Sequence, residues 1–168
     1  MKTRGKVLHA YVAAHATSAS TAVGIVFVDD RGDVVRRVGR RLQEPRSEPA
    51  RDLAAFRGIL HALWNARRLG CRRVIVHSDH PGVVRQINGA CEVQFGLIGP
   101  YLEVRALLHA YRSARVEADA SDWAEEARAL AAAALAADVT DHIVRDLPLW
   151  AGPGAEAGSS GRPGPAVA

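Results

Sequence analysis

The 168-residue sequence has few cysteines and no long apolar segment. Its two cysteines, Cys71 and Cys91, have no second Cys or His at metal-ligand spacing, which argues against a zinc site or a disulfide framework and favours buried thiols. The longest apolar runs have the length of a strand or belong to an alanine-rich helix, so we expect neither a membrane span nor a signal peptide. These absences favour a cytoplasmic protein.

Acidic residues are also absent from the first 28 positions, since the first carboxylate of the chain is Asp29. Over the whole sequence, 22 Lys and Arg residues exceed 18 Asp and Glu residues, which gives a formal net charge of +4. This surplus is compatible with a polyanionic partner but does not identify one. The length suits one domain, and Gly, Pro, Ala and Ser dominate after Pro148. We predict a domain over residues 1–147 and a flexible tail over 148–168.

Hydrophobic periodicity predicts a mixed α/β fold that opens with three antiparallel strands. Strands are expected over residues 6–13, 21–29, 33–43, 73–77 and 115–118. Helices are expected from an N-cap at Ser47 to Gly70, and over residues 81–87, 100–111 and 122–137. In these helices Trp64 and Trp123 are expected to be core anchors.

Asp79 follows the apolar strand over residues 73–77 at the point where the next helix begins. In open α/β sheets, ligands bind at the carboxyl ends of the strands, so Asp79 is the first candidate site residue. The alternative is that Asp79 serves only as the N-cap of the helix that begins near Pro81. We favour the functional interpretation.

Two motifs around this residue are typical of one family. Val74-Ile-Val-His-Ser-Asp79 followed by Val83-Val-Arg-Gln-Ile-Asn-Gly89, and then Pro100-Tyr-Leu-Glu-Val-Arg-Ala-Leu-Leu, resemble the ribonuclease H-like family in its short, reverse-transcriptase-like type. The resemblance covers about residues 6–135. It implies a five-stranded mixed sheet, three antiparallel strands and then two parallel ones, flanked by helices. It also implies an endonuclease that hydrolyses the RNA strand of RNA/DNA hybrids with two Mg²⁺ or Mn²⁺ ions held by four carboxylates.

The resemblance assigns catalytic, metal-binding roles to three acidic residues. Asp79 matches the third acid of the family, and Asp52, in Arg51-Asp52-Leu-Ala-Ala55-Phe, matches the second, where the family has Glu. The fourth acid falls on Glu125 of Ser121-Asp-Trp-Ala124-Glu125. An alignment shifted by one helical turn puts Arg128 there instead, and we prefer Glu125.

The first acid of the family has no counterpart. It is an Asp at the end of strand one that contacts both metal ions, whereas this chain reads Ala10-Tyr-Val-Ala-Ala-His15 and has Ala13 at that place. Without this shared charged ligand, two-metal catalysis should fall by many orders of magnitude. His15 and His80 lie nearby in the sequence, but imidazole suits Mn²⁺ or Zn²⁺ better than Mg²⁺.

Three hypotheses remain open at this point. The leading one is a ribonuclease H-like domain with a degenerate catalytic site that binds nucleic acid, RNA/DNA hybrid first among the candidates, or a protein partner. It would need Mg²⁺ or Mn²⁺ only if it cleaves. The second is an active, divergent enzyme, and the third is a structural or oligomerising module with a protein partner or a second copy of itself. No membrane partner is expected. Arginines that could contact phosphates, or could serve solubility alone, cluster at positions 36, 37, 40 and 41 and at 67, 68, 72 and 73.

Overall fold

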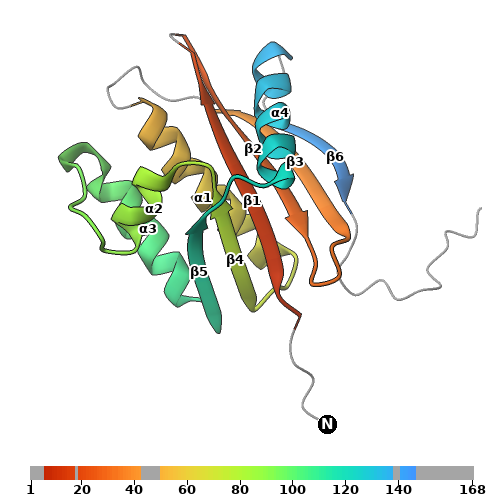
Figure 1. The fold of residues 1–168 in the computed structure, drawn as a ribbon, viewed down its shortest axis with the longest axis horizontal. Helices are drawn as coiled ribbons and strands as arrows, with labels where there is room; N and C mark the ends of the chain where they lie inside the picture. Colours follow the sequence, from red (N-terminus) through yellow and green to blue (C-terminus); the bar gives the residue numbers. More distant parts are fainter. Residues whose placement is uncertain (1–5, 18, 43–49, 138–140, 147–168) are drawn as a thin grey trace, which may run out of the picture.

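The computed structural model describes residues 6–17, 19–42, 50–137 and 141–146, the last range through its backbone. It contains one mixed sheet with the strand order β5-β4-β1-β2-β3-β6 (Figure 1). The strands are β1 Leu8–Ala16, β2 Thr21–Val28, β3 Val34–Leu42, β4 Arg73–Ser78, β5 Ser113–Ala118 and β6 Asp141–Asp146. The helices are α1 Ala50–Arg68, α2 Pro81–Ile87, α3 Ile98–His109 and α4 Asp122–Ala136, with a short 3₁₀ helix at Phe95–Leu97.

The five expected strands are confirmed, and so is their mixed pairing. β1, β2 and β3 pair antiparallel, whereas β4 and β5 continue the sheet on the other side of β1 in parallel. β6 adds a sixth strand that the sequence did not predict, paired antiparallel with β3. Its sequence, Asp-His-Ile-Val-Arg-Asp, lacks the alternation of apolar and polar residues that marks a half-buried strand. Its pairing therefore depends on the open edge of β3 and not on its own pattern.

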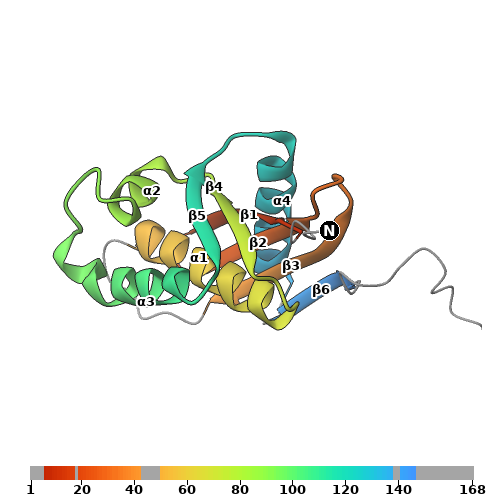
Figure 2. The same cartoon turned by 90° about the horizontal axis from the view of Figure 1, so that it is seen from below.

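Helices cover the sheet on both faces (Figure 2). α4 packs across β1, β2 and β3 on one face, and α1 packs on β1, β2 and β4 on the other, with α3 against α1. The main core lies between α1 and the sheet, where Phe27, Phe56 and Ile59 are fully buried. The carboxyl ends of the parallel strands β1, β4 and β5 therefore lie at the same edge of the sheet, between the helices that cover its two faces.

α4 lies unusually close to the sheet because small residues line both sides of the contact. Its buried residues are alanines at positions 124, 127, 131 and 134. A Cβ atom built on Gly24 of β2 would lie 1.8 Å from the carbonyl oxygen of Ala127, and one on Gly39 of β3 would lie 2.8 Å from that of Leu130. Only glycine at these two positions lets the helix backbone rest on the strands.

The motif after β4 has a structural role in α2. Val83, Val84 and Ile87 are buried in the main core, and the Gln86 side chain accepts a hydrogen bond from the Gln94 backbone N–H at 3.4 Å. Gly89 ends the helix region with a φ of +74°, a conformation that favours glycine. These residues of the motif therefore fix α2 against the core next to Asp79.

Other expectations were wrong for single residues. Trp64 is 49% exposed, whereas Trp123 packs against a buried cluster as expected. Cys91 is exposed and Cys71 is half-buried, where burial raises the pKa of the Cys71 thiol to about 11. The expected N-cap Ser47 and the predicted tail over residues 148–168 lie outside the described residues. No helix in the described part of the chain is long and apolar enough to cross a membrane.

Replacing Gly24 by alanine should destabilise the protein strongly, because the new methyl group would overlap the Ala127 carbonyl and push α4 off the sheet. We expect a loss of at least about 2 to 3 kcal/mol in the free energy of unfolding, measured by chemical denaturation. Gly99→Ala is the matched control, since a Cβ there meets no atom within 4 Å. A Gly24→Ala protein as stable as the control would contradict the close packing.

Candidate functional site

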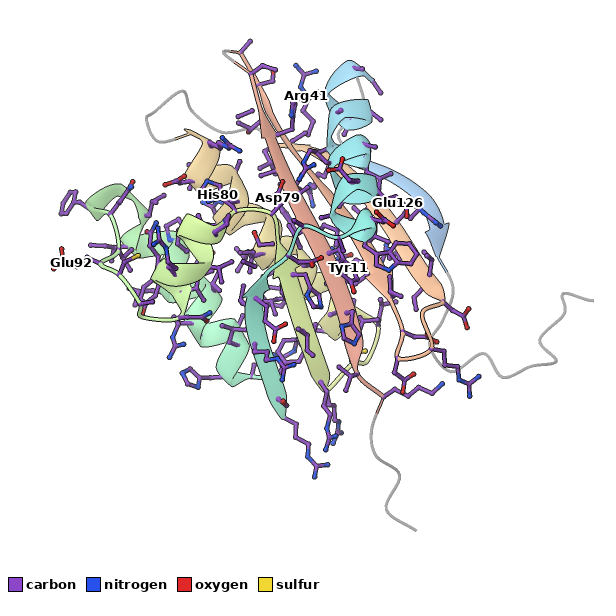
Figure 3. All side chains as sticks on the ribbon, viewed as in Figure 1. Tyr11, Arg41, Asp79, His80, Glu92 and Glu126 are labelled. Atoms are coloured by element: carbon purple, nitrogen blue, oxygen red, sulfur yellow. The ribbon has the colours of Figure 1, made fainter. Side chains whose placement is uncertain are left out.

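Asp79 lies at the edge where three parallel strands end. Its backbone N–H donates to the Val12 carbonyl of β1 at 3.2 Å, and the Ser78 carbonyl of β4 accepts from the Asp119 N–H after β5 at 3.0 Å. The side chain of Asp79 is only 9% exposed. Figure 3 labels Asp79 and His80 together at this end of β4, between α2 and α4. A nearly buried carboxylate therefore stands where the fold can present a ligand.

The charge that neutralises Asp79 comes from α4. The Nε atom of Arg128 donates to Oδ2 of Asp79 at 3.4 Å, and the Nη1 atom of the same guanidinium donates to Glu125 one turn earlier. The hydrogen bond to Glu125 and the charges of Glu125 and Asp79 raise the pKa of Arg128 further above its ordinary value. Arg128 thus stands between two of the acids that were considered as metal ligands, and Glu125 is itself 69% exposed.

The third predicted acid, Asp52 in the first turn of α1, is paired with a histidine. Nε2 of His80 lies 2.9 Å from Oδ1 of Asp52, and Nδ1 of His80 accepts the Val83 backbone N–H at 3.4 Å. Because Nδ1 accepts, Nε2 carries the proton and donates to Asp52. The N-cap of α2 is therefore His80, and the alternative that Asp79 is this cap was wrong. One imidazole both starts α2 and ties it to α1.

Ala13, the residue that the sequence analysis compared with the first acid of the family, lies beside Asp79. The parallel register pairs Val12 with Ser78, so the next residues along the two strands are Ala13 and Asp79. Ala13 is fully buried, in a cluster with Val26 and with Ala127 of α4. Beside Asp79, β1 thus presents a methyl group that makes an apolar contact with α4.

These residues do not fit a two-metal centre. Within the described ranges, no three His, Cys, Asp or Glu side chains are grouped closely enough to hold a metal ion. Hard divalent cations need several anionic oxygens around them, whereas here the three predicted ligands already have cationic or N–H donor partners. The structure brings Asp79 and Glu125 to one guanidinium, and Asp52 to His80.

Comparison with known proteins assigns the family. The family model described as reverse transcriptase-like matches residues 10–134, about three quarters of the chain. The chain belongs to the reverse transcriptase-like family. No curated protein sequence matches it significantly.

Solved structures similar to this reverse transcriptase-like chain have the ribonuclease H fold. RNase H1 of the halophilic archaeon Halobacterium salinarum NRC-1 is 24% identical with a TM-score of 0.71, over 77% of this chain and 98% of that one. The N-terminal RNase H domain of Rv2228c from Mycobacterium tuberculosis is 22% identical with a TM-score of 0.66, over 79% and 94% of the two chains. LC11-RNase H1, solved in complex with RNA/DNA hybrid, is 15% identical with a TM-score of 0.66, over 78% and 96%. The expected family and fold are confirmed.

A second polar group of this family member was not predicted from the sequence. His9, Tyr11 and His77 form a stack on the α4 side of the sheet, with centroids of the Tyr11 and His77 rings 4.4 Å apart. Nδ1 of His9 and Nε2 of His77 are 3.0 Å apart, so one ring donates and the other accepts. The alternation of side chains along β1 could have placed His9 and Tyr11 on one face of the sheet. Their contact with His77 could not be predicted, because it depends on the register that pairs Tyr11 with His77 of β4.

Acid should weaken the fold through His77. Its burial first, and then the neighbouring His9, lower the pKa of His77 below the ordinary value of 6.5. The folded state therefore favours neutral His77: this contribution to stability is complete above about pH 6.5 and is lost as the pH falls toward the lower folded pKa. As the pH is lowered from 6.5, we expect the urea concentration at the unfolding midpoint to decrease less steeply in His77→Gln than in the wild type. His109→Gln, which removes an exposed histidine, is the control, and equal pH slopes in all three proteins would refute this role.

Proposed function

We propose that this chain is a ribonuclease H-like domain that binds nucleic acid, with RNA/DNA hybrid as the preferred ligand, and that cleaves it poorly or not at all. Membership of the reverse transcriptase-like family and the ribonuclease H fold support the nucleic-acid ligand. The net charge of +4 agrees with a polyanionic partner. Two structures of similar fold, LC11-RNase H1 and a foamy viral protease-reverse transcriptase, were solved with RNA/DNA hybrid, which makes hybrid the first ligand to test.

The observation that carries the loss of catalysis is the position of Arg128. Its contact with Asp79 supports the alignment that was not preferred, in which Arg128 and not Glu125 takes the place of the fourth acid. Arginine stays protonated at all ordinary pH values, so its charge cannot be removed to admit a cation. A divalent ion at Asp79 would have to displace Arg128 and would still find an alanine at position 13.

Asp52 contributes to the same argument. A carboxylate one methylene shorter than the family's Glu would have to reach a metal ion from α1, yet here it accepts a hydrogen bond from His80. Recruiting Asp52 to a metal would break that contact and disturb the cap of α2. In this proposal Asp79, Asp52 and their partners hold α1, β4 and α4 together at the edge where a nucleic acid would lie.

Binding without cleavage is the first test. We expect purified full-length protein to bind a labelled RNA/DNA hybrid in EDTA, with affinity that falls linearly on a logarithmic scale as salt rises. Incubation with Mg²⁺ or Mn²⁺ should leave the RNA strand intact, as followed on denaturing gels. Asp79→Asn is the control for contaminating nuclease: cleavage that needs Asp79 would establish an active enzyme instead. Failure to bind hybrid, duplex or single strands at low salt would favour a structural module.

Restoring the two missing acids is the second test. We expect Ala13→Asp with Arg128→Asp to bind Mn²⁺ and to be stabilised by it, because four carboxylates would then surround the end of β4 and bound metal stabilises the folded state. Thermal melts with and without Mn²⁺ measure this shift, which should be absent in the wild type. Arg128→Asp alone should melt at a lower temperature than the wild type, because Asp79 loses its compensating charge, and should show at most a small shift with Mn²⁺. A wild-type protein stabilised as much as the double variant would refute the proposed defect.

A further inference from the structure

Trp64, near the C-terminal end of α1, lies at the surface although its sequence context favoured a place in the core. The residue is 49% exposed. Side chains three and four positions apart are neighbours on a helix surface, so Trp64 lies one turn before Arg67 and Arg68. Both arginines are exposed as well. An indole ring and two guanidinium groups therefore share one surface of α1.

Two more exposed arginines lie at the same end of the molecule. The turn after α1 leads directly to Arg72, which precedes β4. The backbone N–H of Arg112, just before β5, donates to the Arg72 carbonyl at 3.0 Å. Figure 1 shows the end of α1 and the starts of β4 and β5 at one end of the fold. We call Arg67, Arg68, Arg72 and Arg112 the basic end.

The side chain of Tyr111 joins the basic end to the surface of Trp64. Its hydroxyl donates to the carbonyl of Leu63, the residue before Trp64. Burial first, and then the Cys71 thiol, raise the pKa of Tyr111, whereas the charge of Arg67 lowers it, so Arg67 lies close to this phenol. The chain that carries Arg112 is thereby fixed beside α1.

No carboxylate of the described residues neutralises the basic end. The arginine–carboxylate pairs of this part of the chain belong to other positions, such as Arg37 and Arg128. The C-terminal dipole of α1 is equivalent to about half a negative charge, so it offsets only a small part of four positive charges. Solubility does not account for an indole among them, because an exposed Trp leaves a large apolar surface in water. Charge and ring together indicate a ligand that is both anionic and aromatic.

We propose that Trp64 and the basic end bind single-stranded nucleic acid, with a base stacked on the indole and backbone phosphates on the arginines. Bases of a single strand are open to stacking on a side chain, whereas those of a duplex are stacked on one another, and an aromatic ring accepts every base. Guanidinium forks match the oxygen geometry of phosphate.

This surface is distinct from the edge at Asp79. Asp52 and Arg68 lie in the first and last turns of α1, and a rise of about 1.5 Å per residue separates them by about 24 Å along the helix axis. The inference therefore goes beyond hybrid binding at the other end of α1 and does not rest on it.

Fluorescence anisotropy of a labelled oligothymidylate, measured with the full chain in EDTA over a range of salt concentrations, tests the proposal. We expect Trp64→Ala to weaken binding about tenfold with the same salt dependence, because it removes stacking and no charge. Trp64→Tyr keeps an aromatic face and should retain most of the affinity. Arg68→Gln should reduce the slope of log affinity against log salt by about 0.7, the contribution of one phosphate contact on a single strand.

Arg115→Gln is the matched control for charge, since the Arg115 side chain is 64% exposed but pairs with Glu117 on β5. It should bind like the wild type, and thermal melts should show that all variants are folded. Absence of oligothymidylate binding at low salt, full affinity in Trp64→Ala, or equal slopes in Arg68→Gln and Arg115→Gln would each overturn the proposal.

A blunt RNA/DNA hybrid separates this surface from the proposed function. The blunt hybrid offers no single strand, so Trp64→Ala should bind it like the wild type, and an equal loss on both ligands would overturn the assignment to single strands. A wild-type chain that binds oligothymidylate through Trp64 but fails to bind blunt hybrid would refute hybrid binding alone and support this surface.

Discussion

The close contact between α4 and the sheet is the constraint on which the site depends. Gly24 and Gly39 let the helix backbone touch β2 and β3, and the alanine face of α4 fills the remaining space. At this separation Ala127 covers Ala13, and the next residue, Arg128, extends over the end of β4 to Asp79. A helix standing further away would leave room beside β1 and would withdraw the guanidinium. The packing and the electrostatics of this edge are therefore one arrangement.

Charge pairing and hydrogen bonding compensate the acidic residues at this edge. Asp79 is nearly buried, and a buried carboxylate costs several kcal/mol unless a charge or hydrogen bonds compensate it. Arg128 supplies that compensation for Asp79, and His80 does so for Asp52. In the proposed function these two contacts replace metal ions as the source of local stability, which is a reason for both acids to remain after catalysis is lost.

The sequence predicted the parts of the molecule that local pattern encodes. Periodicity identified the five strands and four helices to within a few residues, and the motif after β4 singled out Asp79. Strand β6 was not predicted, because its pairing depends on the edge of β3, which is distant in the sequence. The role of His80 as a helix cap was not predicted either, because Asp is a commoner N-cap residue than His. Only the packed structure shows that the imidazole contacts both Val83 and Asp52. Contacts made across the sheet, such as that of Arg128, need the packed structure.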